Sequence, residues 1–222
     1  YRRRVVDGLL SLAGRAHAAV PLEVLAALTA LTVAPFIVVM STSFVRIVVV
    51  LSLVRSAIGA AALPPNAVLT GLALVLSAAI MAPTLARISH DALDPYAKGA
   101  IAQPVFLERA AAPLSDFMLR QSHADDIALF RRVAHRPGTA GKPPLVVLVP
   151  AFVVGELRDA FAIGFALYLP FVAIDLAVAS ILMGLGMFML SPPVISLPVK
   201  LLLFVMVDGW ALVCGGVASS FR

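Results

Sequence analysis

The side chains with the greatest chemical potential are ionisable groups that stand inside long apolar runs. At membrane depth such a group costs about 3 kcal/mol unless it faces a partner or water. The set holds three bases and four acids: Arg46, Glu156, Arg158, Asp159, Asp175, Lys200 and Asp208. Because the signs nearly balance, the groups could pair within the chain or between subunits. We expect them to be buried polar contacts that hold an assembly together.

The spacing of these charges limits how they can pair. Lys200 and Asp208 are eight residues apart, which separates them by roughly 80° around a helix. A direct contact on one helix needs a spacing of three or four residues, so each is expected to find its partner on another helix or subunit. Snorkelling toward an interface is the alternative for Arg46 and Lys200. It does not suit the short side chain of Asp175, which apolar residues flank on both sides.

The sequence contains no recognisable catalytic or metal-binding motif. The HExxH, GxSxG and GxxxxGK[ST] spacings are absent, so the common metalloprotease, hydrolase and nucleotide-binding signatures fail. The four histidines are scattered, and the closest approach to a cluster is His123 beside Asp125 and Asp126. We interpret these as surface helix residues. We predict no enzyme activity, catalytic residue, cofactor or metal.

The composition indicates a membrane protein. Of 222 residues, 61% are hydrophobic and 13% charged, and the mean hydropathy is +1.02. A soluble domain has about a quarter of its residues charged, and one core could not hide this much apolar surface. The net charge is +5, but the basic residues are not gathered into a stripe, which excludes a nucleic-acid partner in favour of anchoring beside a membrane. The single cysteine, Cys214, makes an internal disulfide impossible.

The elements that must position these charges are long apolar helices. The first run extends from Val24 to Val54 and the second from Ala67 to Ala86; both can cross a bilayer, which takes about 20 residues, and together they predict a helical hairpin. The third run continues to Leu190 and the fourth from Val194 to Val217. Their interior charges favour bent helices packed against partners.

Proline pairs and polar segments divide the chain. Each of Pro64-Pro65, Pro143-Pro144 and Pro192-Pro193 is expected to end one helix and precede another, because proline lacks a backbone donor. We predict an all-α membrane protein of bent helical hairpins. Its predicted parts are an N-terminal mature segment at 1–23, a first apolar helical hairpin at 24–86, a hydrophilic and mostly helical domain at 87–143, and a second helical hairpin with a gating loop at 144–222.

Several strings resemble one protein family. The segment from Met40 to Arg46 (MSTSFVR) resembles the "MTSFTR" signature of the FliP family of flagellar export proteins, and the segment from Phe117 to Phe130 (FMLRQSHADDIALF) resembles its "FMLRQTREADLALF" stretch. Further strings follow in the family's order: LVRSAIG from Leu53, PPNAVLTGLA from Pro64, MAP from Met81, PAF from Pro150, GEL from Gly155, IDL from Ile174, GLGM from Gly184, LPVK from Leu197 and VDGW from Val207. The resemblance covers nearly the whole chain from about Ala34. Phe188 interrupts a frequent run of three methionines, His123 replaces a frequent arginine, and Gly155 replaces a common serine.

The resemblance implies a function and a set of partners. It implies a pore-forming subunit of the flagellar type III export gate, which passes unfolded flagellar proteins across the bacterial inner membrane. Several copies would assemble with FliQ-like and FliR-like subunits into a helical pore complex, beside FlhA-like and FlhB-like components and membrane lipid. The chain begins with Tyr1 followed by three arginines, which by the positive-inside rule would place this end in the cytoplasm. A cleaved signal peptide is usual in this family and would instead place the N-terminus in the periplasm. We follow the family on this point and expect the hydrophilic domain to lie in the periplasm as well.

The segment from Met183 to Pro193 (MGLGMFMLSPP) is the best candidate for a gate. Gly184 and Gly186 loosen the helix, and the proline pair ends it. Between them lie Met187, Phe188 and Met189. Unbranched, polarizable methionines repack around varied partners, and hydrophobic constrictions exclude water. The residues alone favour ordinary helix packing, whereas the resemblance implies a methionine-rich constriction at these positions.

Three alternatives stay open at this point. The virulence injectisome contains a homologous R-component, although Arg46 and the FMLRQ segment favour the flagellar branch. A small-solute or proton-coupled transporter would use the same buried charges as a relay; it predicts internal repeats, and none is evident. An intramembrane enzyme would need a nucleophile and base, which the sequence does not supply.

Overall fold

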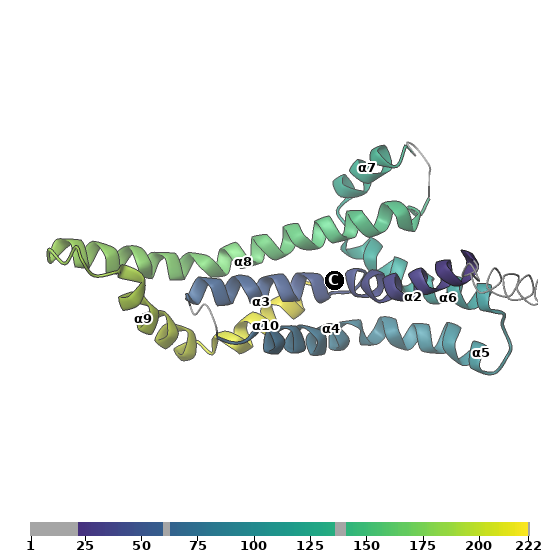
Figure 1. Cartoon of the computed structure of the whole chain (residues 1–222), viewed down its shortest axis with the longest axis horizontal. Coiled ribbons are helices and arrows are strands. Elements are labelled where there is room, and N and C mark those ends of the chain that lie inside the picture. Colours follow the sequence, from purple (N-terminus) through teal and green to yellow (C-terminus); the bar gives the residue numbers. More distant parts are fainter. Residues whose placement is uncertain (1–21, 60–62, 136–140, 222) are drawn as a thin grey trace, which may run out of the picture. The chain divides into compact units, whose positions relative to one another are not determined.

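The computed structural model describes residues 22–59, 63–135 and 141–221, and all regular secondary structure among them is helical (Figure 1). The all-α fold class is therefore confirmed. The chain divides into two compact units, Tyr1–Val38 and Val39–Arg222, which are described separately. Nearly all of the predicted 1–23 segment lies outside the described residues. The other predicted domain boundaries stay predictions.

Helix α2 (Leu22–Met40) is apolar around its whole circumference, with Pro35 in its interior. A helix that is hydrophobic on all sides belongs in lipid or inside an assembly. Contrary to the expectation of one run from Val24 to Val54, the helix ends at Met40, and α3 (Phe44–Ile58) begins after a break. In the break the Thr42 hydroxyl donates to the Val39 carbonyl at 2.8 Å. Such local side-chain bonds compete with the helical ladder.

The second unit is built around α3. It packs along α8 (Leu145–Gly184) on one side and against α4 (Asn66–Ile88) on the other (Figure 1). Four fully buried side chains on α3, Ile47, Val50, Leu51 and Val54, form the centre of the main core. Helices α3 and α4, which follow one another along the chain, thus pack side by side.

The hydrophilic segment is helical, as predicted. A π-helical turn, η1 (Ser89–Leu93), and the short α5 (Asp94–Ala97) extend α4, and then α6 (Gln103–Gln121) and α7 (Ala124–Val133) follow. A second core forms where α6 meets α4 and α8, from Met81, Phe117, Met118, Leu148 and Phe152. This core fixes the hydrophilic segment against the start of α8, so charges from α7 and α8 come close together.

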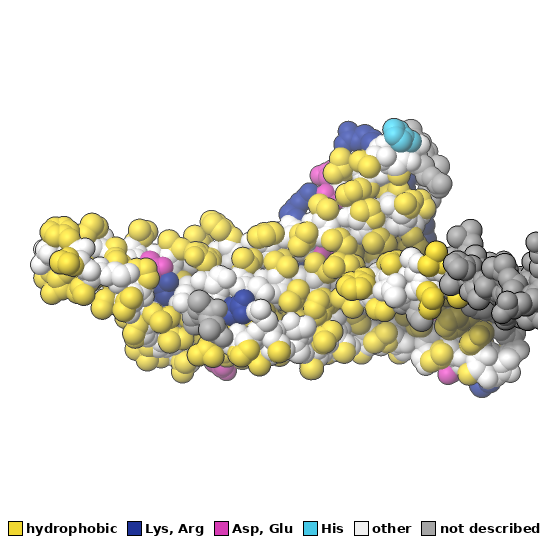
Figure 2. Space-filling view, viewed as in Figure 1, with side chains coloured by type: hydrophobic (Ala, Val, Ile, Leu, Met, Phe, Trp, Pro, Cys, Tyr) yellow, Lys and Arg dark blue, Asp and Glu magenta, His cyan; other side chains and the backbone are white. Residues whose placement is uncertain are grey.

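Among the described residues, two helical stretches are long and apolar enough to cross a membrane: Asn66–Ala97 and Leu145–Gly184. The helices α9 (Pro192–Met206) and α10 (Gly209–Ser219) together read as a third, broken span bent by 64°. Each proline pair stands directly before or at the start of a helix, as expected. Hydrophobic side chains cover most of the drawn surface over α8 and α9 (Figure 2), which agrees with an all-α membrane protein.

Candidate functional site

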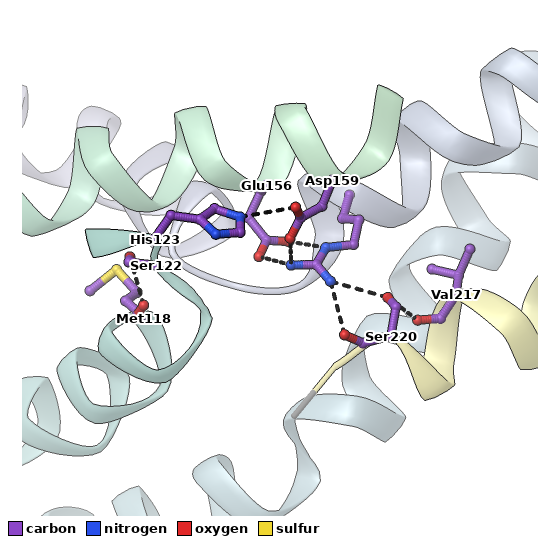
Figure 3. Close-up of polar contacts among 8 residues, drawn as sticks. Met118, Ser122, His123, Glu156, Asp159, Val217 and Ser220 are labelled. Atoms are coloured by element: carbon purple, nitrogen blue, oxygen red, sulfur yellow. Dashed lines mark hydrogen bonds and ion pairs between the residues drawn. The ribbon is translucent and has the colours of Figure 1, made fainter. Parts of the chain in front are cut away.

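A buried ion cluster forms where α3 crosses α8. The Arg46 guanidinium donates from Nε to Glu156 Oε2 at 2.9 Å and from Nη2 to Glu156 Oε1 at 2.6 Å. Nη2 also lies 2.9 Å from Asp159 Oδ2. Figure 3 shows Glu156 and Asp159 projecting from α8 toward the same guanidinium. Arg46 is 2% exposed and Glu156 0%, so this bidentate pair is shielded from water and geometrically specific.

The end of α10 completes this cluster. Arg46 Nη1 donates to the backbone oxygen and to the hydroxyl of Ser220, both at 3.1 Å. The Phe221 ring lies under the guanidinium, with 4.2 Å from its centroid to Cζ, a favourable cation–π distance. All three guanidinium nitrogens of Arg46 therefore have partners, and one side chain joins α3, α8 and the segment after α10.

The cluster continues into the hydrophilic segment. His123 Nε2 lies 3.0 Å from Asp159 Oδ1 (Figure 3). Arg158 donates to Asp126 Oδ1 at 2.6 Å. The Asp126 side chain is 3% exposed, and its Oδ2 has no hydrogen-bond partner among the described residues. Beside this oxygen stands Gly155, where an added Cβ would lie 3.6 Å from Oδ2.

A second ion pair ties α9 to α8. Lys200 Nζ lies 2.6 Å from Asp175 Oδ2, and the Ser196 hydroxyl donates to Asp175 Oδ1 at 2.6 Å. Nζ also donates to the Ala57 carbonyl at 3.3 Å. That carbonyl belongs to the last turn of α3, where a cation is favoured by the helix dipole. This pair holds α9 against both neighbouring helices.

The predicted gate residues lie in the loop between α8 and α9. The helix ends at Gly184, and Gly186 takes a φ of 73°, a left-handed conformation that glycine adopts without strain. The next helix begins at Pro192. Between them the exposed fractions are 46% for Met187, 80% for Phe188 and 101% for Met189. These side chains are not packed in the core of this chain.

The structure thus brings together five of the seven predicted charges, in two groups: Arg46, Glu156 and Asp159 in one, and Asp175 and Lys200 in the other. Arg158 is exposed and pairs with Asp126 instead. Asp208 is exposed, and its carboxylate forms no hydrogen bond or ion pair with a described residue. Whether these residues contact other subunits stays a prediction.

Four polar residues complete these networks without having been predicted to do so: His123, Asp126, Ser196 and Ser220. His123 and Asp126 were interpreted as surface helix residues, which is wrong for Asp126, because its side chain is 3% exposed. Asp126 carried a signal, because it shares a face of α7 with Phe130, one turn away. The serines carried none, since only the tertiary fold sets them beside charges. Among the residues that the structure describes, no group of three or more His, Cys, Asp or Glu side chains could hold a metal ion.

Fold and site define an all-α membrane protein with ion pairs between its helices and an apolar loop left exposed. The FliP family model matches residues 27–217, and the chain belongs to this family. Flagellar biosynthetic protein FliP of Caulobacter vibrioides is 51% identical over 197 residues, covering 88% of this chain and 74% of that protein. The same-named protein of Pectobacterium carotovorum is 50% identical over 201 residues (90% and 78%), and that of Bacillus subtilis 45% over 201 residues (90% and 91%). The predicted resemblance is confirmed.

Proposed function

We propose that this chain is a pore-forming subunit of the flagellar type III protein export gate, passing unfolded flagellar proteins across the inner membrane. Family membership and relatives named as flagellar biosynthetic proteins support the flagellar branch over the injectisome. The chain contributes no catalysis in this role. It forms part of a conduit, and its chemistry is that of packing and sealing.

The exposed loop between α8 and α9 carries this proposal. Met187, Phe188 and Met189 are 46%, 80% and 101% exposed, so packing within the chain does not explain them. Three consecutive apolar side chains exposed on a loop are unfavourable in water. If several copies place these loops around one axis, the side chains form a hydrophobic ring. Such a ring excludes water and ions, and flexible methionines deform around a passing polypeptide.

The remaining apolar surface supports an obligate assembly. Large exposed side chains recur along α8, α9 and α10, among them Phe165, Leu176, Leu202 and Met206. The proposed cover is made by further copies of this chain, FliQ-like and FliR-like subunits, FlhA-like and FlhB-like components at the periphery, and membrane lipid. The complex belongs in the flagellar basal body, with the hydrophilic segment in the periplasm.

The experiment that tests the proposal measures ion leakage in cells that assemble the complex. The native chain is compared with Met187→Ala/Phe188→Ala/Met189→Ala, and the readout is collapse of the membrane potential, reported by a voltage-sensitive dye. We expect the triple variant to assemble normally and to leak ions, because alanine is too small to close the ring.

A matched control keeps the result specific. Leu74, Val75 and Leu85, on α4, are 50%, 68% and 50% exposed, and their replacement by alanine removes exposed apolar side chain away from the loop. This control is expected to stay sealed. A triple variant that assembles and seals as well as the native complex would overturn the assignment of the loop as the constriction.

A further inference from the structure

Asp208 is the one member of the predicted charge set for which the described residues supply no partner. Arg46, Glu156, Asp159, Arg158, Asp175 and Lys200 all form ion pairs within the chain. The Asp208 side chain accepts no hydrogen bond from the start of α10 and takes part in no ion pair among the described residues. The role of this carboxylate must therefore be sought outside the fold.

The surroundings of Asp208 make its isolation costly. The preceding residues Val205, Met206 and Val207 are 74%, 76% and 50% exposed, and Leu212 on the next turn is 55% exposed. Asp208 thus stands on an apolar surface of the broken span formed by α9 and α10. A carboxylate on such a surface is expensive at membrane depth unless a counter-charge meets it.

Asp208 precedes α10, but its carboxylate does not cap the first turn of this helix. An aspartate before a helix normally accepts a bond from the second or third helical N–H group. Asp208 instead has φ 49° and ψ 54°, a left-handed conformation that is uncommon for a non-glycine residue. At this bend Gly209 lies close against the Phe204 ring, where an added Cβ would come within 2.3 Å of a ring carbon. The strained turn therefore presents a free carboxylate.

We propose that Asp208 and the exposed apolar residues beside it dock an apolar helix of another gate subunit that carries one basic side chain. The inference rests on the proposed function only in requiring a multisubunit membrane complex. An apolar surface with a single negative charge is complementary to an apolar helix with a single positive charge. Once lipid and water are excluded, that charge pair specifies the register of the two helices.

The charge inventory of this chain argues that the cation comes from a different subunit. The basic side chains on α3, α4, α8 and α9 are Arg46, Arg55, Arg87, Arg158 and Lys200, and each is engaged within the chain. The sequences of α2 and α10 contain no basic residue. A second copy therefore has no unengaged cation on these helices to offer.

The test uses the complete complex in a strain that lacks its own FliP. Asp208→Asn, Asp208→Lys and Asp208→Glu are compared by the amount of tagged gate complex recovered in mild detergent. We expect Asp208→Glu to retain the complex, Asp208→Asn to lower its yield by at least about tenfold, and Asp208→Lys to abolish it. Glu108, an exposed acid on α6, supplies the matched controls Glu108→Gln and Glu108→Lys, which should assemble normally.

Two further measurements distinguish a lost contact with another subunit from misfolding of this chain. The variant chain alone, purified in detergent, should unfold at the same temperature as the native chain, because no described residue forms a hydrogen bond or ion pair with the Asp208 side chain. Suppressors of Asp208→Lys should replace a lysine or arginine of another subunit by an acid; suppressors within this chain would overturn the assignment to a different subunit. If the native chain restores motility and Asp208→Asn assembles fully, the inference fails alone. If the native chain does not restore motility, it is the proposed function that fails.

Discussion

The Arg46 cluster and the loop between α8 and α9 are opposites, although both depart from the rule that charged side chains are exposed and apolar side chains are buried. In the cluster, Arg46 and Glu156 are charged and almost fully buried, and the chain itself supplies their partners. In the loop, Phe188 and Met189 are apolar and almost fully exposed, and the chain leaves them uncovered.

The difference separates what one chain completes from what it leaves to others. A buried charge without a partner would destabilise the folded chain at once, so the cluster must be complete before assembly. An exposed apolar side chain does not prevent the single chain from folding, and it is removed from water when another surface covers it. We infer that the cluster serves folding and the loop serves the assembled gate.

Of the substitutions that test this difference, Arg46→Ala is expected to lower the free energy of unfolding the most. The substitution leaves Glu156 buried beside Asp159 with no cation, and losing one partner of a buried pair costs about 3–5 kcal/mol. The free energy of unfolding of the purified chain in detergent, followed by circular dichroism, measures this loss. Arg46→Lys should recover only part of it, because an ammonium cannot form the bidentate pair.

The same measurement on a loop variant should show almost no loss of stability. Met187→Ala/Phe188→Ala/Met189→Ala removes more side-chain volume than Arg46→Ala, yet it should change the free energy of unfolding by less than about 0.5 kcal/mol, as exposed substitutions do. A loss comparable to that of Arg46→Ala would mean that the loop is part of the folded core, and the contrast between the two regions would be wrong.

The sequence predicted where several helices begin but missed two of the breaks between them. Proline pairs and apolar runs predicted the helix starts at Asn66, Leu145 and Pro192 closely, because proline acts locally on the backbone. The break after Met40 was missed, since Ser41–Ser43 interrupt the helix through side-chain hydrogen bonds that hydropathy does not register. The turn at Asp208 was also missed: the close approach of Gly209 to the Phe204 ring at this turn is a property of the fold that hydropathy does not register.

For the ion clusters, the sequence predicted which charged residues take part but not which residues they pair with. Arg46, Glu156 and Asp175 stand out because a charge in an apolar run is conspicuous. Their partners include Ser220 and Ser196, which lie 174 and 21 residues away. Such serines are common in helices and carry no signal until the fold is known. The pairing of Arg46 with both Glu156 and Asp159 depends likewise on how α3 crosses α8.

A smaller effect, and one of opposite sign, is expected from Gly155→Ser. The added Cβ would lie 3.6 Å from Asp126 Oδ2, so the hydroxyl can donate to this buried oxygen, which has no other partner among the described residues. A satisfied buried acceptor contributes about 0.5–1.5 kcal/mol. The contact of 3.3 Å with His123 can relax, because the imidazole is 42% exposed.

Gly155→Ala is the matched control for that gain. Alanine adds the same Cβ and the same helix preference over glycine but has no hydroxyl. The free energy of unfolding should therefore rank serine above alanine by the value of the hydrogen bond. Equal stability of the two variants would show that Asp126 Oδ2 is already satisfied by water, and that the cluster is complete without residue 155.

A small effect concerns Asp116, which lies on α6, outside the membrane-spanning helices, and pairs with Arg87 and Lys142. Lys142 Nζ lies 2.6 Å from Asp116 Oδ1, and Arg87 Nη2 lies 3.2 Å from Oδ2. The hydrogen bond from Lys142, helped by Arg87, holds the pKa of Asp116 below its ordinary value. The folded chain thus binds the proton more weakly than the unfolded chain, so the triad stabilises the fold above the unfolded pKa of about 3.9.

This stabilisation is lost as the pH falls below 3.9 through the lower folded pKa. Because the three side chains are partly exposed, the whole contribution should stay below about 1 kcal/mol and shrink in salt. The difference in the free energy of unfolding between the native chain and Asp116→Asn should therefore narrow from pH 7 to pH 3. A difference that is independent of pH would assign Asp116 a packing role. Even then the loss would be small beside that of Arg46→Ala, because the partners of Asp116 are exposed to water, whereas Glu156 and its partner Arg46 are buried.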